Sequence, residues 1–159
     1  MLNEENTFSD VYNGMSILNT RIKDVINLVY DEIKKNPYDE NLKKLLSDLE
    51  DIAQCGMDVQ VIKKDNFSSV YDGMDVLYSK VDDLMGMIYK DLKKGISDNK
   101  TEKFLSDLKK IAQCVIYIQA GIVKNYPDKK KVSVLLGAVN SKAEELEKIS
   151  DIRVNKARI

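Results

Sequence analysis

The chain contains an internal sequence repeat with a spacing of 59 residues and no gap. Residues 8–15 (FSDVYNGM) return as residues 67–74 (FSSVYDGM), and residues 47–55 (SDLEDIAQC) return as residues 106–114 (SDLKKIAQC). Across the 59 paired positions from Phe8/Phe67 to Asn66/Asn125, 23 are identical. Two helical segments that share only an amphipathic pattern would not agree so often. We therefore interpret the chain as a duplicated unit, with repeat 1 over residues 8–66 and repeat 2 over residues 67–125.

Apolar residues in each repeat recur at alternating steps of three and four, which is the spacing of one face of an α-helix. The first stripe consists of Phe8, Val11, Met15, Leu18, Ile22, Val25 and Val29. A second stripe runs through residues 42–59, and repeat 2 shows the same two stripes at residues 67–88 and 104–122. Each repeat is therefore predicted to form a helical hairpin.

Helix ends are predicted from caps and breakers. Thr7 precedes Asp10 by three residues, a relative of the capping box that predicts a helix start at Thr7. Lys34, Lys35, Asn36 and Pro37 mark the end of the first helix, and a run of two lysines and Gly95 marks the end of the third. Asp128 is the predicted N-cap of a fifth helix over residues 128–152. The apolar positions of that helix are Val132, Leu135, Leu136, Val139, Ala143, Leu146 and Ile149.

One hairpin of this length is near the lower limit for a self-sufficient hydrophobic core. Two hairpins that cover each other would form an antiparallel four-helix bundle. The predicted fold is therefore all-α, a single helical domain over residues 1–159 built from two tandem hairpins and a C-terminal fifth helix. One alternative keeps the hairpins apart and buries them in a dimer. The fifth helix either packs along the bundle or pairs with a second molecule.

Positions that are identical in both repeats divide into apolar and polar sets. The apolar set lies on the stripes and is predicted to be core. Gly14 and Gly73 lie inside helices, where glycine is unfavourable, so we expect another backbone to approach them closely. The polar set includes Tyr12/Tyr71 and Gln54/Gln113, which are the candidate partner contacts of a surface displayed twice. Such a surface would bind a dimeric partner or one partner twice; interhelical hydrogen bonds are the alternative explanation.

The sequence lacks the residues that catalytic and metal sites usually require. It contains no histidine, which removes the commonest general base and transition-metal ligand. Acidic pairs fall off the apolar stripes and are typical of solvated helix faces. Phosphate-binding loops and nucleophile elbows are absent from the sequence. Cys55 and Cys114 occupy equivalent positions and are expected to be reduced. We therefore expect no cofactor, no metal and no enzymatic activity.

Hydropathy predicts the location of the protein, and the distribution of charge bears on whether it binds nucleic acid. No apolar run is long enough to span a membrane and the N-terminus does not resemble a signal peptide, so we expect a cytoplasmic protein. Residues 124–159 carry nine basic and five acidic side chains. Lys129, Lys130 and Lys131 are therefore the candidate contacts for a nucleic acid. The pI near 5.6 argues against that function.

These features favour a non-enzymatic protein–protein interaction module, an adaptor or a small inhibitor of the kind that a mobile element or virus carries. The expected partner is a protein, and a homodimer is a further expectation for the fifth helix. The first alternative is a nucleic-acid-binding accessory protein that uses Lys129, Lys130 and Lys131. The second alternative is a helical bundle that binds a ligand between its helices.

Overall fold

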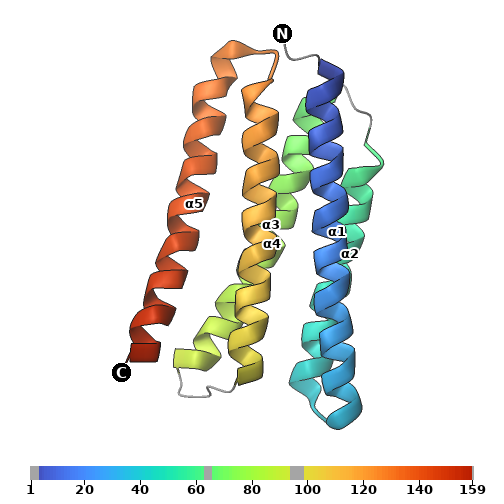
Figure 1. Cartoon of the computed structure of the whole chain (residues 1–159), viewed down its shortest axis with the longest axis vertical. Coiled ribbons are helices and arrows are strands. Elements are labelled where there is room, and N and C mark those ends of the chain that lie inside the picture. The colour runs from blue at the N-terminus through green and yellow to red at the C-terminus, as the bar shows by residue number, and fades with distance from the viewer. Residues whose placement is uncertain (1–3, 63–65, 94–98, 159) are drawn as a thin grey trace.

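The computed structural model describes residues 4–62, 66–93 and 99–158, and the side chains of residues 11–62, 66–90 and 101–148. It contains α1 (Glu4–Lys35), α2 (Glu40–Gln60), α3 (Phe67–Lys93), α4 (Asn99–Lys124) and α5 (Lys129–Arg158) (Figure 1). Nearly all of the described residues lie in these five helices, and the described part of the chain has no strand. The all-α prediction is confirmed.

The first four helices form a ring. α1 packs beside α2 and α4, and α3 packs beside the same two helices. The two hairpins therefore bury their apolar faces against each other within one chain, and the alternative in which they stay apart is wrong. α5 packs outside the ring against α4, on the side away from α1 and α2 (Figure 1).

The core lies inside the ring and follows the predicted stripes. From Val11 to Val29 every stripe residue of α1 is buried, and α3 and α4 bury theirs as well. Among the described side chains of α5, only Val139 and Leu146 are buried, and Leu136 remains 44% exposed. Leu136 is therefore a correction to the predicted stripe, because α5 has a single helix as backbone neighbour and buries a narrower face. The side chains of Phe8 and Ile149 lie outside the described residues.

Two of the predicted helix starts have different outcomes. α1 begins at Glu4, so Thr7 lies inside the helix and is not its cap. Acidic residues in this first turn suit the positive end of the helix dipole and allow the earlier start. The prediction for Asp128 is confirmed, because its side chain accepts the backbone N–H of Lys130 at 3.1 Å. Asp39 caps α2 in the same way, a helix start that the sequence analysis does not predict.

Gly14 and Gly73 each meet a side chain of a neighbouring helix. A Cβ at Gly73 would lie 2.6 Å from Cγ2 of Val59, and a Cβ at Gly14 would lie 3.0 Å from Cγ1 of Ile118. Close approach is therefore the reason for both glycines, as expected. The group that approaches is a β-branched side chain, not a backbone, which corrects that part of the prediction.

None of the described helices combines the length and apolar content that crossing a membrane would require.

Candidate functional site

α5 covers one outer face of the hairpin formed by α3 and α4. We call this the covered face; it consists of Tyr71, Asp75, Tyr78 and Asp82 of α3 and Lys109, Ile116 and Gln119 of α4. The residues 59 positions earlier form the corresponding face of the first hairpin. We call it the open face; it consists of Tyr12, Ser16, Asn19 and Lys23 of α1 and Glu50, Met57 and Gln60 of α2.

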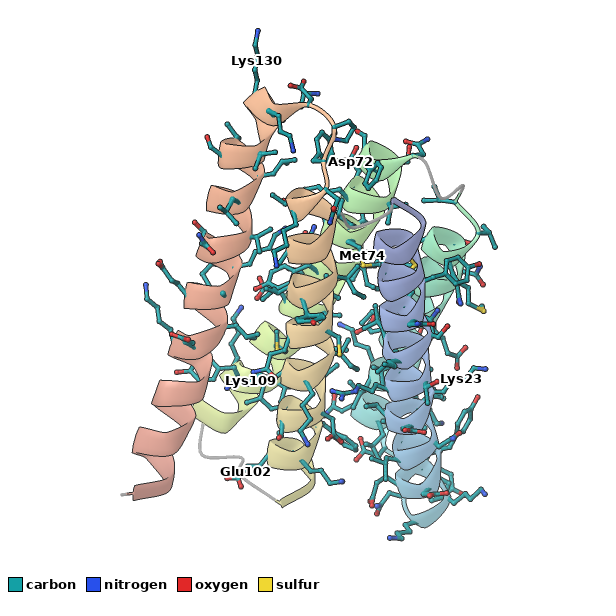
Figure 2. All side chains as sticks on the ribbon, turned by 45° about the horizontal axis from the view of Figure 1, so that its top comes forward. Lys23, Asp72, Met74, Glu102, Lys109 and Lys130 are labelled. Atoms are coloured by element: carbon teal, nitrogen blue, oxygen red, sulfur yellow. The ribbon has the colours of Figure 1, made fainter. Side chains whose placement is uncertain are left out.

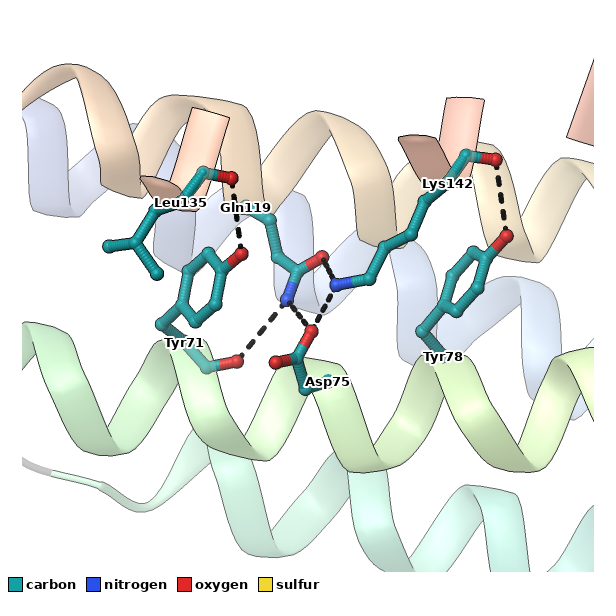
Figure 3. A network of polar contacts seen from close by, with 6 residues as sticks. All are labelled: Tyr71, Asp75, Tyr78, Gln119, Leu135 and Lys142. Atoms are coloured by element: carbon teal, nitrogen blue, oxygen red, sulfur yellow. Dashed lines mark hydrogen bonds and ion pairs between the residues drawn. The ribbon is translucent and has the colours of Figure 1, made fainter. Parts of the chain in front are cut away.

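Lys142 of α5 anchors the covered face (Figure 3). Its ammonium lies 5.5 Å from the ring centroid of Tyr71 and 5.4 Å from that of Tyr78. It donates to the Asp75 carboxylate and, at 2.8 Å, to Oε1 of Gln119. Gln119 is fully buried, and its Nε2 donates to Asp75 at 2.8 Å and to the Tyr71 carbonyl at 3.3 Å. The lysine thus has an anion, an amide oxygen and two aromatic faces as partners.

The two tyrosines of the covered face also bind the backbone of α5. Tyr71 donates its hydroxyl to the Leu135 carbonyl at 3.4 Å, and Tyr78 donates to the Lys142 carbonyl at 3.2 Å. Both pairs are 64 residues apart, so α5 runs parallel to α3 in a fixed register. Burial, with nearby carboxylates as the smaller cause, raises the pKa of each tyrosine to about 12. Both hydroxyls therefore remain protonated donors near neutral pH.

Charged residues flank the covered face. Burial, followed by repulsion from Glu145 of α5, raises the pKa of the Asp82 carboxyl. Lys109 and Glu147 line the same small cavity of about 140 Å³ between α4 and α5. Asp82 of α3 is therefore repelled by Glu145 of α5, whereas Lys109 of α4 has the opposite charge of Glu147 nearby.

The open face keeps the interhelical glutamine but has no lysine anchor. Nδ2 of Asn19 donates to Oε1 of Gln60 at 2.7 Å, and Nε2 of Gln60 donates to Oγ of Ser16 at 3.3 Å. Ser16 and Asn19 stand where the covered face has Asp75 and Tyr78. The result is an uncharged polar cluster in the middle of the face.

Within the described part of the chain, no helix packs on the outer side of α1 and α2. The exposure of paired residues reflects this difference. Tyr12 is half-buried whereas Tyr71 is 3% exposed, and Gln60 is half-buried whereas Gln119 is fully buried. Met57 is 47% exposed. Three further half-buried residues, Ile26, Leu46 and Ala53, have the buried counterparts Met85, Leu105 and Ala112. The first hairpin thus presents to solvent a face whose counterpart is covered.

The four predicted partner contacts have different environments. Tyr12 belongs to the open face and Tyr71 lies beneath α5, so the two tyrosines are not displayed equally. Gln54 is exposed and donates to Asp58 within α2 at 2.9 Å. Gln113 is exposed and lines a groove on each side of α4. Whether these residues contact a partner stays a prediction.

The lysines of the nucleic-acid alternative lie at the first turn of α5. Lys129, Lys130 and Lys131 are all exposed, and Lys130 projects from the end of the bundle (Figure 2). Nucleic-acid binding by this cluster also stays a prediction.

A feature that the sequence reasoning missed is a pair of adjoining grooves between α1 and α4. Their volumes are about 460 and 520 Å³, and Arg21 and Lys110 line both. Tyr117, which is 81% exposed, and Ile17, which is 53% exposed, line the larger groove. Tyr117 replaces Asp58 of the first repeat, and this departure from the repeat was the available signal.

The cysteines and the acidic residues whose side chains are described form no recognisable reactive site. Cys55 and Cys114 are free and half-buried, and burial raises the pKa of the Cys55 thiol. A raised pKa keeps a thiol protonated and unreactive near neutral pH. No group of three or more cysteine, aspartate or glutamate residues that could hold a metal ion occurs among the described residues.

No protein-family model matches the chain, and neither a curated protein nor a solved structure matches it significantly. The two faces of the hairpins are therefore the basis on which a function is assigned.

Proposed function

We propose that this chain is a non-enzymatic protein–protein interaction module and that the open face is its contact surface. The observation that carries the proposal is the unequal coverage of the two hairpins. α5 covers Tyr71 and Gln119, and the described residues place no helix over Tyr12 and Gln60. A partner that covers this face would remove the apolar area of Met57 and of the Tyr12 ring from water, which is favourable.

The composition of the open face supports this assignment. Tyrosine and methionine are enriched where proteins bind one another, and Tyr12 and Met57 lie on this face. Val61, the C-cap residue of α2, is also apolar and is 81% exposed. Exposed apolar residues that gather on one side of a protein mark interaction sites. In this proposal the chain acts in the cytoplasm as an adaptor or a small inhibitor.

Affinity capture from the native host with two matched variants tests the proposal. Met57→Glu places a charge in the open face, and Met87→Glu places the same charge on α3, where the methionine is 42% exposed. The two wild-type methionines have nearly equal exposure, so both variants should fold, which circular dichroism will verify. We expect Met87→Glu to capture the same proteins as the wild type, and Met57→Glu to lose at least one of them.

The opposite pattern would count against the assignment. If Met57→Glu captures every protein that the wild type captures, the open face is not the contact surface. In that case the groove that contains Ile17 and Tyr117 becomes the surface to test next.

A further inference from the structure

We infer that the open face receives an amphipathic α-helix of the partner protein, in the register that α5 adopts on the covered face. This inference rests on the proposed function and specifies the partner. The chain supplies its own template, because α5 is a helix seated on the equivalent surface of the other hairpin. An amphipathic helix that lays its apolar side on another protein is also a common mode of recognition.

The template fixes the direction and the spacing of the partner helix. Leu135 meets Tyr71 and Lys142 meets Tyr78, so α5 advances seven residues while α3 advances seven. We number the partner helix so that its position 1 corresponds to Leu135 of α5 and its position 8 to Lys142. By the same register this helix runs parallel to α1, with position 1 at Tyr12 and position 8 at Asn19. The corresponding residues of α5 at positions 1, 5 and 12 are Leu135, Val139 and Leu146. We therefore expect apolar residues at these three positions of the partner helix.

The middle of the open face selects an uncharged residue at position 8. On the covered face this position is Lys142, which pairs with Asp75 and with two tyrosine rings. The open face has Ser16 and Asn19 at the places of Asp75 and Tyr78, so a lysine would be buried without an anion. Burying an unpaired charge is strongly unfavourable, and the partner helix therefore carries a neutral side chain there.

The flanks of the open face select charges. Lys23 stands where the covered face has Asp82, and Figure 2 shows Lys23 on the side of α1 away from α5. Glu50 stands where the covered face has Lys109. The corresponding residues of α5 are Glu145 at position 11 and Glu147 at position 13. An acid at position 11 would face Lys23 and a base at position 13 would face Glu50, which is the complementary arrangement.

The same chemistry disfavours α5 of a second copy as the occupant. That helix would bring Lys142 to position 8 and an acid, Glu147, to position 13 opposite Glu50. Two of its polar positions thus oppose the open face, so we commit to a helix from a different protein.

Two peptides on the full-length chain test the inference by fluorescence polarisation. One peptide has the sequence of residues 129–148, and the matched peptide differs only by Lys142→Gln and Glu147→Lys. Both carry a lactam bridge on the solvent side so that helix formation is equal. We expect the matched peptide to bind at least about tenfold more tightly, the ratio that one well-placed charge interaction supplies.

Three protein variants locate the binding. Met57→Glu should weaken the matched peptide at least about tenfold, a typical loss at the centre of an interface, whereas Met87→Glu should change its affinity less than about twofold. Ser16→Asp restores the anion of the covered face and should shift preference towards the peptide that keeps Lys142. Absence of saturable binding, equal affinities of the two peptides, or insensitivity to Met57→Glu would each overturn the inference.

Light scattering tests whether a second copy of the chain, and not a different protein, occupies the open face. A dimer that Met57→Glu converts to a monomer would show that a second copy covers the open face, and would also overturn the inference. If Met57→Glu abolishes capture of a host protein while neither peptide binds, the helical partner is wrong and the proposed function stands. If the peptides bind as expected but capture is unchanged, the proposed function fails.

Discussion

Replacement of Lys142 by methionine isolates the contact that attaches α5 to the bundle. Methionine keeps the unbranched apolar stem, so the packing of the side chain is retained while the charge is lost. The change removes the ion pair with Asp75, the hydrogen bond to Gln119 and the approach of the ammonium to two tyrosine rings.

The magnitude follows from the burial of each partner. Gln119 is fully buried, and leaving its Oε1 without a donor costs about 1–3 kcal/mol. The Asp75 side chain is 44% exposed, so its ion pair contributes at most about 1 kcal/mol. Each ring adds about 0.5 kcal/mol. Because these contacts share one amine they are not additive, and we predict a loss of about 2–3 kcal/mol in the free energy of unfolding.

Urea denaturation followed by circular dichroism measures the loss, and hydrogen exchange shows whether α5 opens first. Lys148→Met is the control, because Lys148 is an exposed lysine of the same helix and its replacement should cost less than about 0.5 kcal/mol. The reasoning is refuted if Lys142→Met is no more destabilising than this control. A double-mutant cycle that combines Lys142→Met with Asp75→Asn should show a coupling energy of about 1 kcal/mol between the two residues. A coupling energy of zero would contradict the ion pair.

Four further predictions concern single groups. Tyr78→Phe removes the hydrogen bond to the Lys142 carbonyl and should lower stability in urea by about 1 kcal/mol. The pKa of Tyr71 and of Tyr78 is raised to about 12, so both stay protonated in the folded chain while the unfolded chain ionises above about pH 10. Stability should therefore fall between about pH 10 and 12, by at most about 1.4 kcal/mol per unit for each tyrosine, and a flat profile would contradict this. Asp82→Asn removes a carboxylate whose pKa is raised by burial and by Glu145. At pH 7 it should raise the free energy of unfolding by about 0.5 kcal/mol and the melting temperature with it. This gain should shrink in acid, where Asp82 is protonated. If Lys129, Lys130 and Lys131 bind nucleic acid, replacing all three by glutamate abolishes a steeply salt-dependent affinity for DNA or RNA; a loss no larger than for three distant lysines removes that alternative.

The helices and the core were predictable from the sequence because spacing alone determines which side of a helix is apolar. The stripe from Val11 to Val29 is buried as predicted, since its residues repeat at steps of three and four. The position of α5 was not predictable in the same way. Its short stripe fits any apolar face, and the choice depends on polar partners of Lys142 that come from two other helices.

The candidate site was harder to predict because identity between the repeats hides differences in surroundings. Tyr12 and Tyr71 are the same residue 59 positions apart, yet among the described helices one covers Tyr71 and none covers Tyr12. The informative positions were those at which the repeats differ. Asp75 and Tyr78 stand 59 positions after Ser16 and Asn19, and both contribute to the binding site for Lys142.

Hydroxyl-radical footprinting of the isolated chain, with mass spectrometry of each modified residue, tests the unequal coverage of the two hairpins most directly. The structure predicts rapid modification of Met57 and measurable modification of Tyr12. It predicts protection of Tyr71, Tyr78 and Met85 until the chain unfolds. Modification of Tyr71 and Tyr78 as fast as that of Tyr12 would show that α5 does not cover its face, and the assignment of an open counterpart would lose its basis.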